Sequence, residues 1–237
     1  NIQPLLQRAF NRQFYKFAIR FNHQTTHTGQ LVDRAPVASG FGVNHHKYGV
    51  IFSKLTTYNF LKFYNITNVE IISQKPEDMP VTIAGGSVDA ISIFDPYAFF
   101  AEQKLGNKTT TFGDESLYSE FYVLSAKRNW TDSNPETVKS LIKALVRASD
   151  FIKANPNEAK TILMNSTKLD KTTVDGIWDK FSPNPELTDK LLEYLDAEAQ
   201  WAKETGKVTP ETQVPDFKEY IYDSALKSVK PENTRIP

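Results

Sequence analysis

Strand-like and helix-like segments alternate through the first half of the chain, and this alternation limits it to an α/β fold. The run at 48–52 is strand-like, an amphipathic helical pattern follows at 55–64, and 69–72 is a second strand. A short helix opened by proline is predicted over 76–84, and a third strand over 88–94. Such a βαβαβ unit predicts a mainly parallel sheet with helices on its faces.

The segments on either side of this unit are also strand-like. Apolar runs at 14–21 and 31–32 predict two strands separated by a polar loop at 22–29. A further strand is predicted over 120–126. We find no internal repeat in the sequence.

The second half of the chain is predicted to be helical. Asn134-Pro135 supplies an N-cap and a proline at the first helical position, and Asn155-Pro156 repeats the pattern. Glu158 is placed to bond back to the second cap. Further helical patterns cover 173–180, 187–203 and 217–229, the last two divided by a connector rich in Gly, Thr and Pro at 206–215.

Composition excludes several classes of function. Lysine plus arginine total 28 and aspartate plus glutamate total 28, so no net charge attracts nucleic acid or an anionic membrane. The chain has no cysteine, which excludes disulfides, cysteine-ligated metals and thiol nucleophiles. Its apolar runs are far shorter than the roughly 20 residues of a membrane helix. It begins without methionine or an apolar leader, so we expect any signal segment to be removed or outside this chain.

The short motifs of common catalytic and nucleotide sites do not occur. The sequence contains no phosphate-binding loop, no HExxH and no GxSxG. The four histidines are expected in solvated loops, so we predict neither a metal site nor a cofactor; they are His23, His27, His45 and His46.

The turn at 53–57 is the strongest candidate for a binding site. It follows a buried strand and opens a helix, so unpaired N–H groups and the positive end of the helix dipole face the carboxyl edge of the sheet. Ser53, Thr56 and Thr57 add hydroxyl donors for an anion, although such residues also serve simply as N-caps. Asp95-Pro96-Tyr97 follows the third strand at the same edge, where open α/β sheets place ligands, and it can equally be only a turn.

Several of these segments together resemble one family of transport proteins. In order and spacing they are similar to the nitrate, sulfonate and taurine family of ABC-importer substrate-binding proteins. In the α/β half the similar segments are Lys47–Phe52, Thr56-Thr57-Tyr58, Lys75–Pro80, Gly86–Ala90 and Asp95-Pro96-Tyr97. In the helical half they are Asn134-Pro135-Glu136, Asn155–Ala159 and Pro215-Asp216-Phe217.

The resemblance implies a two-lobe fold like that of type II periplasmic binding proteins, with the helices in the C-terminal part. The expected ligand-binding lobe is 30–126, while 1–29 and 127–237 supply hinge strands and the other lobe. The family's opening βαβ has no counterpart before Phe14, so we expect the first lobe to be incomplete. The chain departs from the family at Ser53-Lys54, where Gly-Thr or Gly-Ser is usual, and at Phe94-Asp95-Pro96, where Trp-Glu-Pro is common.

The function implied by the resemblance is capture of a small anionic or zwitterionic solute by closure of the two lobes. The partners would be that solute and a membrane permease, and the location periplasmic or otherwise extracytoplasmic, without catalysis. The expected ligand-binding residues are Ser53, Thr56, Thr57, Tyr58, Asp95, Tyr97 and Thr25. Two alternatives are an enzyme similar to the thiamine-pyrimidine synthases, whose cysteine-rich motif this chain lacks, and a ligand-sensing domain of a larger receptor.

Overall fold

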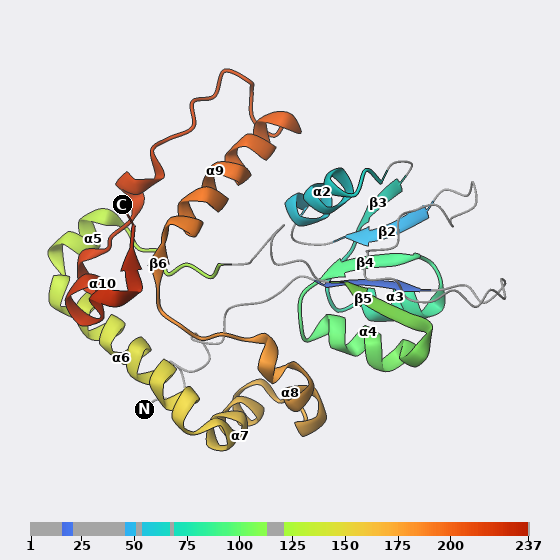
Figure 1. The fold of residues 1–237 in the computed structure, drawn as a ribbon, viewed down its shortest axis with the longest axis horizontal. Helices are drawn as coiled ribbons and strands as arrows, with labels where there is room; N and C mark the ends of the chain where they lie inside the picture. Colours follow the sequence, from blue (N-terminus) through green and yellow to red (C-terminus); the bar gives the residue numbers. More distant parts are fainter. Residues whose placement is uncertain (1–15, 21–45, 51–53, 67–68, 113–120, 237) are drawn as a thin grey trace. The chain divides into compact units, whose positions relative to one another are not determined.

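The computed structural model of the chain describes residues 16–20, 46–50, 54–66, 69–112 and 121–236 (Figure 1). The chain divides into two compact units, one formed by residues 13–120 and the other by 1–12 with 121–237. The assignment of 30–126 as a ligand-binding lobe stays a prediction.

The unit of residues 13–120 contains a five-stranded sheet in the order β3-β2-β4-β1-β5. The strands are β1 (Lys16–Arg20), β2 (His46–Val50), β3 (Val69–Ser73), β4 (Ala90–Ile93) and β5 (Thr109–Phe112). β2 pairs in parallel with both β3 and β4, which confirms the predicted βαβαβ unit. β1 lies between β4 and β5 and is antiparallel to both, so the sheet is mixed rather than mainly parallel.

The reason for the mixed sheet lies in chain order. β1 precedes the βαβαβ unit, and the connection from β4 to β5 passes over it. The predicted strand at 14–21 is therefore confirmed for 16–20 but joins the sheet between two later strands. The strand predicted at 31–32 lies outside the described residues.

In the described part of this unit, three α-helices accompany the sheet, and two of them share one of its faces. They are α2 (Lys54–Phe63), α3 (Met79–Gly85) and α4 (Tyr97–Leu105), followed by the 3₁₀ turn η1 (Gly106–Lys108). α3 and α4 lie on one side of the sheet and α2 on the other (Figure 1). The core beneath α3 and α4 is built from Met79, Ile83, Ile91 and Ile93, all of them fully buried. The predicted helices at 55–64 and 76–84 are thus confirmed.

The unit that contains residues 121–237 is mostly helical. Its α-helices are α5 (Arg128–Ser133), α6 (Pro135–Ala154), α7 (Pro156–Thr167), α8 (Lys171–Ile177), α9 (Asp189–Glu204) and α10 (Ser224–Val229). Its 3₁₀ turns are η2 (Trp178–Lys180), η3 (Phe217–Tyr220) and η4 (Pro231–Asn233). The strands β6 (Leu187–Thr188) and β7 (Thr234–Arg235) pair in parallel. The helix predicted over 217–229 is broken, because 221–223 leaves the helical path between η3 and α10.

The strand predicted over 120–126 is wrong for the described residues 121–126, which have no regular structure. Tyr122, Val123 and Leu124 are 45%, 62% and 57% exposed. Their strand propensity is real, but a strand forms only where a partner offers hydrogen bonds, and this segment pairs with no strand of the described chain.

The Asn-Pro pairs mark helix starts as predicted, but the capping reason is wrong. Neither Asn134 nor Asn155 caps its own helix through its side chain. Instead the Asn134 amide donates to the carbonyl of Trp130 at 2.9 Å, and the Asn155 amide donates to the carbonyl of Phe151 at 3.3 Å. Each asparagine therefore closes the preceding helix, and the proline that follows starts the next one.

A second core joins α6, α7 and α8. Ile152, Leu163 and Val174 are buried in it, and Trp178 packs against it. α8 is capped by Asp170, whose Oδ1 accepts from the Thr173 N–H at 2.9 Å. That hydrogen bond is the main reason why the pKa of Asp170 lies below its ordinary value.

An ion cluster on the surface ties α7 to α8. The Lys160 ammonium donates to Asp175 at 2.7 Å, and Lys171 donates to the other oxygen of the same carboxylate. These two hydrogen bonds lower the pKa of Asp175. The Lys160 ammonium also lies 5.3 Å from the centre of the Trp178 ring, so its stem and charge cover the indole.

Candidate functional site at the carboxyl edge of the sheet

Two connections meet at one edge of the sheet in the unit of residues 13–120. α2 follows the carboxyl end of β2, and Asp95-Pro96-Tyr97 follows the carboxyl end of β4. β2 and β4 are adjacent and parallel, with Val50 opposite Ser92, so both connections leave from the same edge. The chain turns from β2 toward β3 on one side and from β4 toward β5 on the other. This is a topological switch point, the place where open α/β sheets bind ligands.

The first turn of α2 presents the positive end of a helix dipole at this edge. α2 has ten residues, no acidic residue in its first turn, and Lys62 in its last turn. Its N-terminal dipole is therefore not neutralised by a carboxylate of its own first turn, which favours a bound anion. The predicted start of a helix just after a strand is confirmed, because β2 ends at Val50 and α2 begins at Lys54.

Two of the predicted site residues, Thr57 and Tyr58, lie in the part of α2 whose side chains the structure describes. Thr57 is 1% exposed, and Tyr58 is half-buried with the Lys62 ammonium 5.3 Å from its ring centre. Thr56 lies in α2, of which only the backbone is described at that position, and Ser53 and Thr25 lie outside the described residues. Their role in binding stays a prediction.

Asp95 holds the first turn of α4. It is 1% exposed, and its Oδ1 accepts a hydrogen bond from the Phe99 N–H at 3.1 Å. The peptide bond from Asp95 to Pro96 is cis. The turn is thus held by a buried carboxylate, which accepts a hydrogen bond from a first-turn N–H that has no acceptor within the helix.

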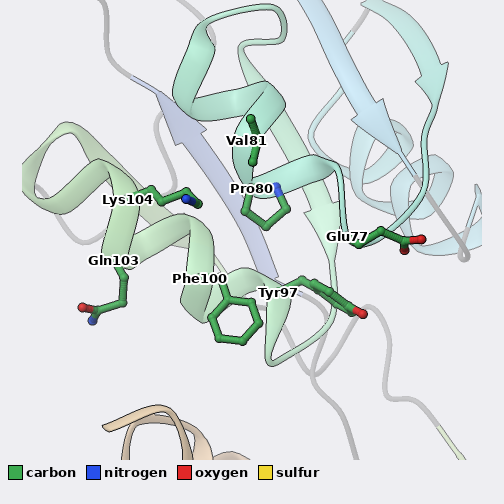
Figure 2. Close-up of a pocket in the computed structure, with 7 residues that line it drawn as sticks. All are labelled: Glu77, Pro80, Val81, Tyr97, Phe100, Gln103 and Lys104. Carbon is green, nitrogen blue, oxygen red and sulfur yellow. The ribbon is translucent and has the colours of Figure 1, made fainter. Parts of the chain in front are cut away.

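Tyr97 opens α4 and lines a groove of about 520 Å³ between α3 and α4 (Figure 2). Its ring meets those of Phe94 and Phe100 edge-on, with centroids 5.5 Å and 6.0 Å away. The groove is lined by Glu77, Pro80, Val81, Tyr97, Phe100, Gln103 and Lys104. Its lining is mainly apolar, which distinguishes it from the polar edge at α2.

Sequence reasoning missed one polar residue at this edge. Ser92 lies in β4 and is 2% exposed. We interpreted 88–94 only as an apolar strand, so Ser92 received no role. The signal was a single hydroxyl between two isoleucines in a strand that is buried throughout.

Two other features are absent from the described ranges: a metal-binding cluster and a membrane-spanning helix. No group of three or more His, Cys, Asp or Glu residues in that part of the chain is placed to hold a metal ion. Among the helices that the structure describes, none combines the length and apolar character needed to cross a membrane.

Comparisons with known proteins place the chain in a family. The model of the NMT1-like family matches residues 18–165, which is more than half of the chain. A protein of Bacillus subtilis (strain 168), whose name assigns it to aliphatic sulfonate binding, is 26% identical over 151 residues. That match covers 63% of this chain and 45% of the relative, so it spans less than half of the relative's length.

Solved structures share the fold at low identity. The periplasmic aliphatic sulphonate binding protein SsuA from Escherichia coli superposes with a TM-score of 0.65 at 15% identity, over 94% of this chain and 78% of that chain. The alkanesulfonate-binding protein SsuA from Xanthomonas axonopodis pv. citri superposes with a TM-score of 0.57 at 12% identity, over 88% of this chain and 74% of that chain. The desulfurization enzyme DSZB superposes with a TM-score of 0.55 at 12% identity, over 98% of this chain and 83% of that chain.

These likenesses confirm the predicted α/β fold of the periplasmic-binding-protein type. Most of the similar structures are binding proteins, but the fold also occurs in an enzyme. The predicted resemblance to sulfonate-type binding proteins is confirmed as well, because a relative and two of the similar solved structures are named for sulfonate binding. The chain therefore belongs to the NMT1-like family.

Proposed function

We propose that this chain is a solute-binding component of an ABC importer that captures a small anionic or zwitterionic solute, such as a sulfonate, taurine or nitrate. One observation carries the proposal. The first turn of α2 and the turn at Asp95-Pro96-Tyr97 follow neighbouring parallel strands at the switch point of the sheet. The relative and solved structures named for sulfonate binding support the same class of solute.

The physical basis is the backbone N–H groups of the first turn of α2, which have no acceptor within the helix itself. They point toward the carboxyl edge and carry a partial positive charge, so an oxoanion is favoured there. Hydroxyls add donors, and each hydrogen bond to a charged oxygen contributes about 1.5–3 kcal/mol. The proposed ligand-binding residues are Ser53, Thr56, Thr57, Tyr58, Asp95, Tyr97 and Thr25. Closure of the two lobes would then exclude water from the bound solute.

The proposal extends to partners and location. The solute would be delivered to a membrane permease, and the protein would act outside the cytoplasm, as the periplasmic proteins of the same fold do by name. Balanced charge, 28 basic against 28 acidic residues, gives no attraction for nucleic acid. We propose no cofactor.

The proposal also includes the absence of catalysis. The fold occurs in the desulfurization enzyme DSZB, so fold alone does not decide between binding and catalysis. A synthase-like enzyme is disfavoured, because the cysteine-rich motif of that class has no counterpart in a sequence without cysteine. A ligand-sensing domain of a larger receptor would use the same site and is the second reading to test.

The direct test is isothermal titration calorimetry with taurine, alkanesulfonates, nitrate and pyrimidines. We expect saturable heat with at least one anionic or zwitterionic solute, and recovery of that solute chemically unchanged. Thr56→Val should weaken binding, whereas Thr161→Val, on the exposed surface of α7, should not. The proposal fails if none of the anions binds, and a converted solute would point to an enzyme instead.

A further inference from the structure

The side chain of Ser92 is enclosed, and the described residues offer its hydroxyl no hydrogen-bond partner. It is 2% exposed, and its Oγ has no hydrogen-bond partner in the described part of the chain. Buried hydroxyls are normally paired, because one left unpaired retains the full penalty of losing water. An isolated hydroxyl of this kind therefore needs an explanation.

Ser92 faces the side of the sheet where α2 lies. Its neighbours Ile91 and Ile93 point into the core formed with α3 and α4. Side chains alternate between the two faces of a strand, so Ser92 points to the opposite face. α2 lies on that side, away from α3 and α4 (Figure 1).

Ser92 also lies at the level where α2 begins. It pairs with Val50, the last residue of β2, and α2 starts at Lys54. Thr57, in the first turns of α2, is 1% exposed. The Ser92 hydroxyl is thus on the α2 side of the sheet, beside the last residue of the strand that precedes α2.

We propose that Ser92 Oγ donates a hydrogen bond to the bound solute and selects for an oxoanion. This inference rests on the proposed function and deepens it. One oxygen of the anion accepts from the N–H groups of α2, and a second accepts from Ser92. The solute class is a compact headgroup with at least two free acceptor oxygens, as in a sulfonate or nitrate. A site built to hydrogen-bond its ligand discriminates strongly against an analogue that leaves the donor unpaired.

The inference predicts opposite effects on stability and binding. In Ser92→Ala, loss of a hydroxyl that has no partner should leave the urea midpoint of the solute-free protein unchanged or raised. The same variant should bind taurine, ethanesulfonate or nitrate about tenfold or more weakly, because a hydrogen bond to a charged oxygen is lost. A merely structural serine would lower the midpoint and leave affinity unaltered.

The experiment compares Ser92→Ala with Ser87→Ala and the unaltered chain by calorimetry and by urea unfolding without solute. Ser87 is exposed and lies before β4, at the opposite edge of the sheet, so its loss should change neither quantity. Equal affinity of Ser92→Ala and the unaltered chain overturns the inference and leaves the proposed function standing. A lower midpoint of solute-free Ser92→Ala overturns it too, because the hydroxyl is then already paired. If the unaltered chain binds none of the three anions, the proposed function fails, and the inference fails with it.

Discussion

Replacement of Asp95 should reveal how much this buried carboxylate contributes to the stability of the unit of residues 13–120. Its Oδ1 accepts the Phe99 N–H at 3.1 Å, with Asp95 1% and Phe99 9% exposed. Asp95→Ala leaves that N–H buried and unpaired, and a hydrogen bond to a charged group is worth about 1.5–3 kcal/mol. Relief of the buried charge offsets part of this, so we expect a loss of about 2 kcal/mol in the free energy of unfolding. Asp95→Asn keeps an acceptor oxygen and should lose less.

Asp78 provides the matched control, because it also precedes a helix of the same unit. It is the N-cap of α3, but its side chain makes no capping hydrogen bond. Asp78→Ala should therefore change the free energy of unfolding by no more than about 0.5 kcal/mol.

The assay is urea unfolding followed by far-UV circular dichroism. The three tryptophans all lie in the unit that contains residues 121–237; they are Trp130, Trp178 and Trp201. Tryptophan fluorescence would therefore not report directly on the unfolding of the unit of residues 13–120, which contains Asp95. With a slope of about 1–3 kcal/mol per molar urea, the expected loss shifts the midpoint by about 1 M. Equal midpoints for Asp95→Ala and Asp78→Ala would refute the reasoning.

Two further predictions concern the helical unit. Ile152→Ala opens a cavity in the core of α6, α7 and α8 and should lower the free energy of unfolding by about 2–5 kcal/mol, measured by fluorescence of Trp178. Val208→Ala, at an exposed position, should change the free energy of unfolding by less than about 0.5 kcal/mol. Similar losses for both would contradict this account. Asp170→Asn should destabilise the protein at neutral pH, because the Thr173 N–H holds the pKa of Asp170 below its ordinary value of 3.8. The stabilisation by the ionised carboxylate is complete above pH 3.8 and is lost as the pH falls through the lowered pKa of the folded state. The difference in urea midpoint between Asp170→Asn and the unaltered chain should therefore vanish in strong acid. A difference that is constant with pH would contradict this reasoning.

Local patterns were sufficient for many elements because the forces that form them are local. The amphipathic run at 55–64 and the prolines at 135 and 156 placed α2, α6 and α7 within a few residues. The partners of the Asn134 and Asn155 side chains were not predictable from sequence, since each can accept from an N–H of the following helix or donate to a carbonyl of the preceding one. The structure shows the second arrangement at both positions.

The candidate site was predictable in part for the same reason. A strand followed by a helix at 53–57 places N–H groups at the carboxyl edge in any parallel sheet, so the location of the proposed anion site followed from the sequence. The buried state of Asp95, and the isolation of Ser92 on the α2 side, required the sheet order, because burial depends on which strands become neighbours.

The sequence by itself determined the α/β class, the βαβαβ unit and the helical second half, since hydrophobic periodicity and proline act over a few residues. Only the tertiary structure decided that β1 enters between β4 and β5, that 121–126 forms no strand, and that Ser92 is enclosed without a hydrogen-bond partner among the described residues. Strand pairing and burial join residues far apart in the chain, and no local pattern specifies which of the possible partners will meet.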